Sequence, residues 1–332
     1  MRWLGEPMIL AITFEVKDTN RAIVSEGIGG IADIRYLTDL NPSERQDVLK
    51  CADVLLARNT AKELRSEELP LLRRARLIQF LSAGIDYIPL RDLPPGIPLA
   101  SNAGAYAEPM AEHALAMAMA AAKRLFIEHQ NLLLGQFNQF TPNKMLAGRI
   151  CGFFGFGGYG IATARLMRCL GMSIRAINRR GATSEPVDWV GAPDRLDELM
   201  AASDVLIISA PLTRVTERVI GARELSLMKE DAILVNLARG EIVDEVGLYD
   251  HLKAKPRFTA CLDAWWIEPV RHGEFRMNRP FLELPNVIAS PHNSASVPNA
   301  SEVALRHAVA NCRRVLLGEA PLHLIAADDR MR

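Results

Sequence analysis

The stretch RICGFFGFGGYGIATARLMRCLG, residues 149–171, carries a glycine pattern between a strand signal and a helix signal. Gly155-x-Gly157-x-x-Gly160 follows an apolar run and precedes a helical pattern that closes at Gly171. These glycines permit a tight turn, close approach of a pyrophosphate and close packing of a helix on a strand. The alternative is a glycine-rich turn that binds nothing, but the flanking strand and helix favour a dinucleotide-binding unit.

The second strand of such a unit is predicted in SIRAINRRG, residues 173–181. An NAD-binding unit has Asp or Glu about 20 residues beyond its glycine loop, where the carboxylate binds the ribose 2′-hydroxyl. Asn178 stands there instead, and Arg179 and Arg180 follow it. Guanidinium groups bind phosphate well, so the segment predicts NADP(H), with NAD(H) still possible. The alternative, that the arginines only solvate a surface loop, stays open.

Apolar runs without alternation recur along the chain, with helical patterns between them. This is typical of parallel strands covered on both faces, and it predicts an α/β protein with doubly wound sheets. The runs include residues 9–14, 54–57, 77–81, 205–211, 232–238, 260–265 and 287–292. Residues 106–135 predict one long helix rich in Ala and Met, and residues 299–319 predict another; both are expected near the connections between domains.

The composition narrows the class of partner. The chain has 332 residues, enough for two domains, and its 39 basic and 39 acidic residues cancel, which favours a small molecule over nucleic acid or a membrane surface. Five scattered cysteines without a CxxC pair indicate a reducing compartment, so the cytoplasm is expected. The longest uncharged apolar run, residues 114–122, is far below the roughly 18 residues that span a bilayer.

Three reactive side chains follow predicted strands downstream of the glycine loop. Arg239 ends one run, Glu268 follows another and His292 ends a third. Arginine binds a carboxylate, histidine transfers a proton, and a carboxylate orients the imidazole ring. This set predicts exchange of hydride and proton on a 2-keto acid, and no metal is expected.

The chain resembles the D-isomer-specific 2-hydroxyacid dehydrogenase family over nearly its whole length. The matching stretches are FLSAGIDYIPL, SNAGAYAEPMAEHALAMAMAAAKR, GFFGFGGYG, APLTRVTERVIGARELSLMKEDAILVNLARGEIVD, LDAWWIEP and LPNVIASPH. The resemblance implies that Arg239 binds substrate, that His292 is the acid/base and that Glu268 is its partner.

The resemblance also implies contacts for further residues. Ala83 and Gly84 supply backbone N–H groups to the substrate carboxylate, Asn102 begins the first segment crossing between domains, and Arg58 resembles an occasional substrate-side position. A domain-surface role for Arg58 stays open. The cofactor-side residues implied are Gly155, Gly157, Gly158, Tyr159, Gly160, Leu237, Ala238 and Asp263, the last near the nicotinamide carboxamide.

The family's organisation implies two lobes with a cleft between them. Residues 1–101 plus 295–332 would form a discontinuous, flavodoxin-like substrate domain, and residues 102–294 a Rossmann-type cofactor domain. A homodimer through the cofactor domain is implied, in which the Ala/Met helix would lie at the interface; burial of that helix in its own domain is the alternative.

The chain departs from the family pattern at Asn178, at Trp265-Trp266 and in the longer loop 270–284. The tryptophans could shape the substrate pocket or pack in the core, and the loop could cap the cleft, reach a partner subunit or be a plain insertion. The predicted function is NADP(H)-preferring reduction of glyoxylate, hydroxypyruvate or an aryl-pyruvate to the D-2-hydroxy acid. The alternatives are a formate- or phosphite-type dehydrogenase and a dinucleotide-sensing corepressor.

Overall fold

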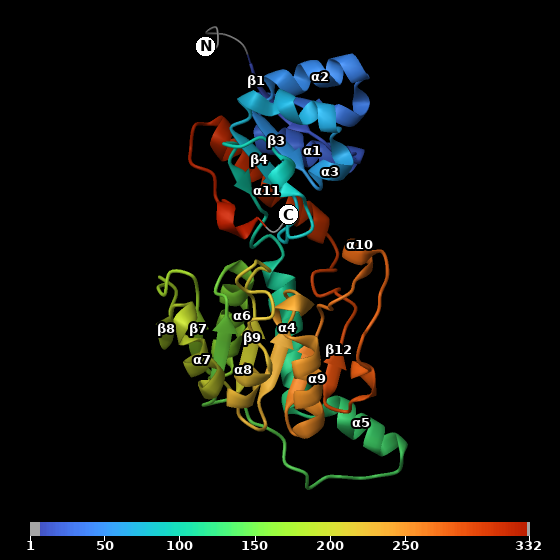
Figure 1. Ribbon diagram of the computed structural model, residues 1–332, viewed down its shortest axis with the longest axis vertical. Helices are drawn as coiled ribbons and strands as arrows, with labels where there is room; N and C mark the ends of the chain where they lie inside the picture. The colour runs from blue at the N-terminus through green and yellow to red at the C-terminus, as the bar shows by residue number, and fades with distance from the viewer. Residues whose placement is uncertain (1–6, 331–332) are drawn as a thin grey trace. The chain divides into compact units, whose positions relative to one another are not determined.

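The computed structural model describes residues 7–330 and divides into two compact units (Figure 1). Unit 1 comprises Met1–Tyr106 and Pro298–Arg332, and unit 2 comprises Ala107–Val297. The domain boundaries predicted above lie three to five residues away, at 101/102 and 294/295; residues 1–6 and 331–332 of that prediction fall outside the described part of the chain.

Unit 1 is built on a five-stranded parallel sheet in the order β2-β1-β3-β4-β5. Its strands are β1 (Met8–Ile12), β2 (Ala32–Tyr36), β3 (Val54–Ala57), β4 (Leu77–Phe80) and β5 (Leu99–Ala100). This is the flavodoxin-like order, in which a crossover reverses direction next to the first strand. β3 and β4 are buried along their whole length, which is why every residue in them except Gln79 is apolar.

Helices cover both faces of this sheet and leave an apolar core on each side. Helices α1 (Asp18–Ile28) and α11 (Ala300–Leu316) pack together, and α11 contacts β3 and β4. Helix α2 (Pro42–Cys51) covers the other side, and α3 (Thr60–Glu63) is a single turn. Asn41 caps α2 by accepting N–H bonds from Ser43 and Glu44, so its start follows directly from the sequence.

Unit 2 contains a seven-stranded parallel sheet in the order β12-β11-β10-β9-β6-β7-β8. Counted from the glycine loop, this is the doubly wound Rossmann order with one additional strand. The strands are β6 (Ile150–Phe154), β7 (Ser173–Ile177), β8 (Trp189–Gly191), β9 (Val205–Ile208), β10 (Ile233–Asn236), β11 (Thr259–Leu262) and β12 (Val287–Ala289). Two parallel sheets confirm the predicted α/β class.

The helices of unit 2 form two layers around its sheet (Figure 1). One layer holds α4 (Ala107–Ala122) and α6 (Gly158–Cys169), which pack closely together. The other holds α7 (Leu196–Ala202), α8 (Ala222–Leu227) and α9 (Glu245–Ala254), and the short α10 (Pro269–His272) follows β11. Within residues 7–330, no helix has both the length and the apolar character that crossing a membrane requires.

The predicted helix over residues 106–135 is in fact two helices, α4 and α5 (Leu125–Leu133). Arg124 adopts a left-handed conformation with φ +53°, which ends α4. Lys144 returns to this point, where its N–H binds the carbonyl of Ala122 and its own carbonyl accepts from Nζ of Lys123. Long-range contacts therefore override the local helix propensity. The buried side chains of α4 lie in the core of unit 2, as in the second of the two roles weighed for this helix.

Candidate functional site

The glycine loop of unit 2 links β6 to α6. Gly155 has φ +91°, and a Cβ added there would lie 2.3 Å from the backbone nitrogen of Ala210. A Cβ at Gly160 would lie 2.7 Å from Oγ of Ser209, whereas one at Gly157 would have no atom within 4 Å. Two glycines thus allow close packing inside the protein, and the third leaves open space beside the helix N-terminus. This arrangement fits the pyrophosphate of a dinucleotide.

The start of α6 has no side-chain cap, because Gly157 occupies the N-cap position and Gly158 begins the helix. Its first N–H groups can therefore receive a ligand. The side chain of Tyr159 is directed into the core instead, and burial raises the pKa of its hydroxyl. Only the backbone of Tyr159 can face a phosphate here.

Asn178 follows the last residue of β7 and braces the turn that contains the two arginines. Its Oδ1 accepts the N–H of Arg180 at 2.9 Å, and its Nδ2 donates to the carbonyl of Ala182 at 2.9 Å. Arg179 and Arg180 are exposed on this turn. The asparagine therefore shapes the turn, and the arginines carry its positive charge.

Leu237 and Ala238 follow β10. Leu237 is fully buried in the core cluster, and the N–H of Ala238 donates to Oδ1 of buried Asn236 at 3.1 Å. Nδ2 of Asn236 donates to the carbonyl of Arg239 at 2.8 Å, so one buried amide fixes the backbone that presents the arginine.

Arg239, Glu268 and His292 follow β10, β11 and β12, which are neighbours in the sheet. Because parallel strands deliver their carboxyl ends to the same edge, all three residues lie at one edge of unit 2. A Cβ added to Gly240 would meet the backbone of Trp265 at 2.4 Å, which shows how closely the turn after β10 approaches the segment after β11.

His292 and Glu268 are directly paired. Nδ1 of His292 lies 2.8 Å from Oε1 and 2.9 Å from Oε2 of Glu268, and the N–H of Trp265 also donates to Oε1 at 2.7 Å. Burial alone raises the pKa of Glu268, but the hydrogen bond and charge of His292, the Trp265 N–H and the charge of Arg239 outweigh it, so the pKa falls below its ordinary value of 4.5. An ionised Glu268 can only accept, so Nδ1 carries a proton and Nε2 faces away from the pair.

Asp263 was predicted beside the cofactor, and the structure gives it further contacts that sequence reasoning missed. It is fully buried and accepts hydrogen bonds from the Ser290 hydroxyl and from the N–H groups of Asn293 and Ser294. His113 of α4 lies 3.0 Å from Oγ of Ser290. The only sequence signal was that Asp263 directly follows a buried strand.

The two tryptophans pack and donate hydrogen bonds within unit 2. Trp265 is buried, and its indole N–H donates to the carbonyl of Ser290 at 2.9 Å. Trp266 stacks on Phe281 and donates to the carbonyl of Val243 at 2.8 Å. Core packing, one of the two interpretations weighed above, is therefore what unit 2 shows for Trp265, whereas Trp266 is half-buried against Phe281.

The loop 270–284 is held against unit 2 by an ion pair, hydrogen bonds and a β-bridge. Arg271 is paired with Glu241, Asn278 donates to both carboxylate oxygens of Glu245, and Ile267 forms a bridge with Arg276. Phe281 is fully buried. The loop is thus an ordered extension of the sheet edge around β11 and β12.

The other predicted substrate residues lie in unit 1. Ala83 and Gly84 follow β4 in an irregular loop, with Ala83 exposed. Asn102 is fully buried, where Nδ2 donates to the carbonyls of Leu81 and Ala304 and Oδ1 contacts His307. The guanidinium of Arg58 lies 4.4 Å above the ring of Phe14.

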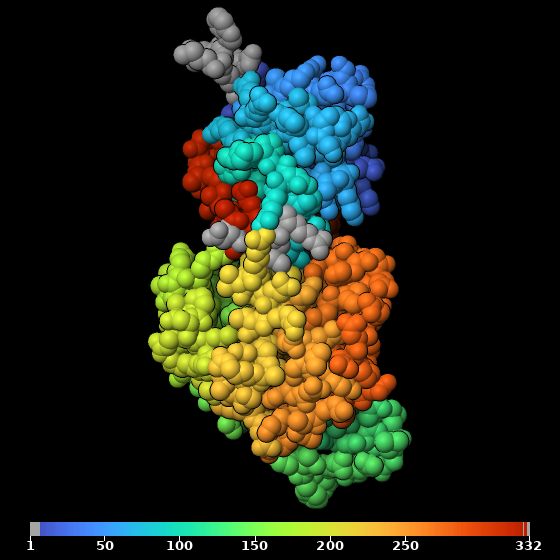
Figure 2. Space-filling model, in the orientation of Figure 1, coloured from blue at the N-terminus to red at the C-terminus, as the bar shows by residue number. Residues whose placement is uncertain are grey.

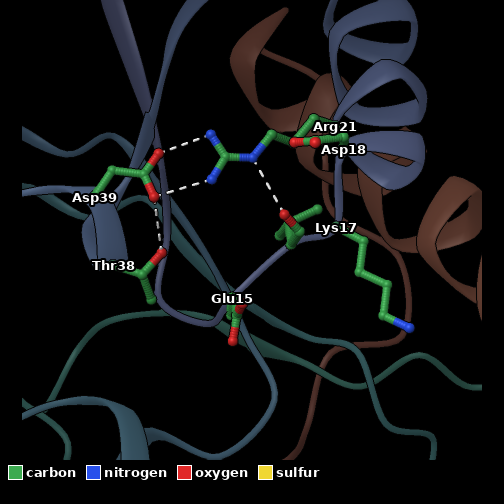
Figure 3. A pocket seen from close by; sticks show the side chains of 7 residues that line it. Glu15, Lys17, Asp18, Arg21, Thr38 and Asp39 are labelled. Atoms are coloured by element: carbon green, nitrogen blue, oxygen red, sulfur yellow. Dashed lines mark hydrogen bonds and ion pairs between the residues drawn. The ribbon is translucent and has the colours of Figure 1, made fainter.

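Unit 1 also has a polar surface pocket, lined by Glu15, Val16, Lys17, Asp18, Arg21, Thr38 and Asp39 (Figure 3). Arg21 binds both carboxylate oxygens of Asp39, at 2.7 and 2.9 Å, and its Nε donates to the carbonyl of Val16. None of the predicted site residues lines this pocket. Among residues 7–330, no group of three or more His, Cys, Asp or Glu side chains is arranged to hold a metal ion.

Comparison with known proteins places this site in a family. The family model described as "D-isomer specific 2-hydroxyacid dehydrogenase, NAD binding domain" matches residues 115–294. Hydroxypyruvate reductase of Thermotoga maritima is 30% identical over 264 residues, which cover 79% of this chain and 84% of that protein. D-3-phosphoglycerate dehydrogenase of Methanocaldococcus jannaschii is 29% identical over 295 residues; the match covers 87% of this chain but only 54% of that protein.

A solved structure supports the fold at the level of both units. The D-isomer specific 2-hydroxyacid dehydrogenase of Xanthobacter autotrophicus, in complex with NADPH and MES, aligns with a TM-score of 0.77 at 22% identity, and the alignment covers 96% of this chain and 98% of that chain. The family model, which matches more than half of the chain, and the 30% identical relative decide the assignment. The chain belongs to the D-isomer specific 2-hydroxyacid dehydrogenase family of NAD(P)-dependent enzymes.

Proposed function

We propose that the protein is an NADP(H)-preferring reductase of small 2-keto acids that yields D-2-hydroxy acids. The observation that carries the proposal is the His292–Glu268 pair beside Arg239, on the ends of three neighbouring strands. The relative from Thermotoga maritima is named for hydroxypyruvate, which supports hydroxypyruvate among the three candidate substrates, beside glyoxylate and aryl-pyruvates.

In this proposal the histidine handles the proton. Its Nδ1–H is held by ionised Glu268, so Nε2 gives a proton to the carbonyl oxygen of the substrate and regains one in the reverse direction. The guanidinium of Arg239 binds the substrate carboxylate and polarises the carbonyl. Bound NADPH supplies the hydride. The substrate roles of Ala83, Gly84, Asn102 and Arg58 stay predictions.

The preference for NADP(H) rests on the turn after β7. Asn178 brings no negative charge to repel a 2′-phosphate, and its two side-chain hydrogen bonds hold Arg179 and Arg180 on an exposed turn. Arginine binds phosphate through parallel charge-assisted hydrogen bonds. The glycine loop and the uncapped start of α6 would hold the pyrophosphate.

We also propose that unit 2 forms a homodimer through residues 125–145, the segment of α5 and the loop after it (Figure 2). Eight large apolar side chains of this segment are 57–88% exposed: Leu125, Phe126, Leu132, Leu133, Leu134, Phe137, Phe140 and Met145. Side chains of this size expose on the order of 1,000 Å² together, comparable with the ~800 Å² that each partner buries in a standard interface.

The helix itself argues for a partner. α5 has nine residues and buries none of them, whereas isolated helices shorter than about 12–15 residues are marginal in water. The segment contains three residues that can carry a charge, Glu128, His129 and Lys144. Glu128 and Lys144 each form an ion pair within their own chain. A second copy offers the same uncharged surface, and two-fold dimers are the commonest assembly.

The cytoplasm remains the proposed location because all five cysteines are free. Cys151, Cys261 and Cys312 are buried, and burial raises the pKa of each thiol. Cysteines that stay as free thiols are typical of proteins in a reducing compartment, and buried thiols with a raised pKa are unreactive.

The test is a matrix of initial rates with glyoxylate, hydroxypyruvate and phenylpyruvate, each with NADPH and with NADH. A higher kcat/KM with NADPH on one of these acids is expected. A preference for NADH would contradict the cofactor proposal. If no keto acid turned over, assays with formate and phosphite would test the related dehydrogenases, and NADPH-dependent capture of a protein partner without turnover would favour the corepressor.

A further inference from the structure

His292 has an unusual backbone. Its φ is +51°, in the left-handed region that residues other than glycine rarely adopt unless their surroundings hold them there. The ring of the same residue makes the pair with Glu268. A change in this turn would rotate the imidazole away from the carboxylate of Glu268. The contacts that hold the turn therefore also hold the hydrogen bond between His292 and Glu268.

The carboxylate of Asp263 binds the chain on both sides of His292. Its Oδ1 accepts from the Ser290 hydroxyl, two residues before the histidine, and from the N–H of Asn293 at 3.0 Å, one residue after it. Its Oδ2 accepts the N–H of Ser294 at 3.2 Å. Asp263 is fully buried, and burial alone raises its pKa, but these hydrogen bonds lower the pKa below its ordinary value. A charged acceptor therefore holds the turn from within the fold.

Ser290 is itself held from two other directions. Because its hydroxyl donates to Asp263, its oxygen accepts from Nε2 of His113, 3.0 Å away on α4. Its carbonyl accepts the indole N–H of Trp265 at 2.9 Å. The segment before His292 is thus fixed to α4 and to the chain that follows β11.

We propose that Asp263 and Ser290 clamp the backbone of His292 in its left-handed turn, which makes Asp263 a positioning residue for the proton-transferring histidine. The inference rests on the proposed function of His292. The clamp directs Nδ1 of the ring to Glu268 and leaves Nε2 for substrate. Asp263 would act through the histidine's backbone, apart from any contact it makes with the cofactor.

The test compares Asp263→Asn and Ser290→Ala with the control Asp204→Asn in the full chain. Asp204 is a similarly buried carboxylate that accepts from a backbone N–H and a lysine, but it precedes β9, at the opposite strand end. Two readouts are kinetic: kcat and the pH profile of kcat/KM with the best keto acid. The NADPH dissociation constant is measured by fluorescence. The proton NMR signal of the His292 ring N–H is assigned by its loss in His292→Gln.

Both clamp variants should lower kcat by about 10²-fold, the size of a small misplacement of a catalytic group. Both should change the pH profile and broaden or remove the ring N–H signal, and Ser290→Ala should keep the NADPH dissociation constant within about twofold of the native value. Asp204→Asn should keep both the profile and the signal. If Asp263→Asn does not fold, Ser290→Ala carries the test, because it removes one hydroxyl only.

Three results would overturn the clamp. Weaker NADPH binding with native kcat at saturation would make Asp263 a cofactor contact alone. A native ring signal and kcat in Ser290→Ala would show that the turn holds itself, and equal losses in Asp204→Asn would show general loosening of unit 2. Unchanged turnover in His292→Gln would instead refute the proposed function, while the ring signal would still decide whether the clamp exists.

Discussion

Both carboxylate oxygens of Glu268 lie within 2.9 Å of Nδ1 of His292, and the N–H of Trp265 fixes one of them at 2.7 Å. The imidazole is thereby held in one orientation and one protonation pattern, with Nε2 left for a reacting group. The pair is complete within unit 2 and needs no residue of unit 1.

Glu268→Gln should lower kcat by about 10²-fold, at the low end of the range for general acid–base catalysis. The amide keeps the shape of the carboxylate but loses the charge that stabilises a protonated ring. Steady-state kinetics at saturating keto acid and NADPH would measure the loss. Glu245→Gln is the matched control, since Glu245 binds Asn278 in the same unit and should leave kcat unchanged. Equal kcat in both variants would refute the role of Glu268.

Acid should destabilise the fold through Asp263. Its pKa in the folded protein lies below the ordinary value of 3.8, so the ionised form stabilises the fold at any pH above that value. As the pH falls through the lower folded pKa, Asp263 takes up a proton and this stabilisation is lost. In thermal melts between pH 7 and pH 3, the Tm of the native protein should be well above that of Asp263→Asn at pH 7. The difference in Tm should become smaller toward pH 3. A constant difference would contradict the shifted pKa.

The cofactor preference should follow the turn after β7. Asn178→Asp brings a negative charge next to the proposed 2′-phosphate and loses the donor to Ala182, and Arg180→Ala removes a phosphate-binding group. Each should lower the ratio of kcat/KM with NADPH to that with NADH by at least about tenfold, as expected for one charged hydrogen bond. Arg165→Ala on α6 is the control, and an identical change there would point to net charge alone.

Much of this arrangement could be predicted from the sequence. The apolar runs and the glycine loop indicate where the strands of unit 2 end, and so Arg239, Glu268 and His292 could be assigned to strand ends. The break at Arg124 could not be predicted, because it depends on Lys144 returning to the end of α4. The clamp at Asp263 was equally hidden, since its partners lie about thirty residues further along the chain.

The oligomeric state should depend on residues 125–145. Leu133→Asp places a charge in the exposed apolar surface and should convert a dimer to a monomer, because burying an unpaired carboxylate opposes association. Light scattering coupled to size-exclusion chromatography would measure the mass. Val215→Asp is the control, as Val215 is 76% exposed in unit 2 outside the segment. A native mass for Leu133→Asp would place the interface elsewhere.

Two glycines of the glycine loop should respond differently to the same substitution. Gly155→Ala should lower the free energy of unfolding by about 3 kcal/mol, because the new methyl group would lie 2.3 Å from the backbone of Ala210 at a residue with φ +91°. Gly157→Ala should leave stability within about 1 kcal/mol, because nothing lies within 4 Å of the added Cβ.

The same open space is where a pyrophosphate would approach the start of α6. Gly157→Ala should therefore weaken NADPH binding by about tenfold or more, the equivalent of roughly 1.4 kcal/mol, in a protein that melts normally. Thermal melts and fluorescence titration with NADPH would separate the two effects. Native affinity in Gly157→Ala would mean that the cofactor does not pass over this glycine, and the loop would then have to be assigned a purely structural role.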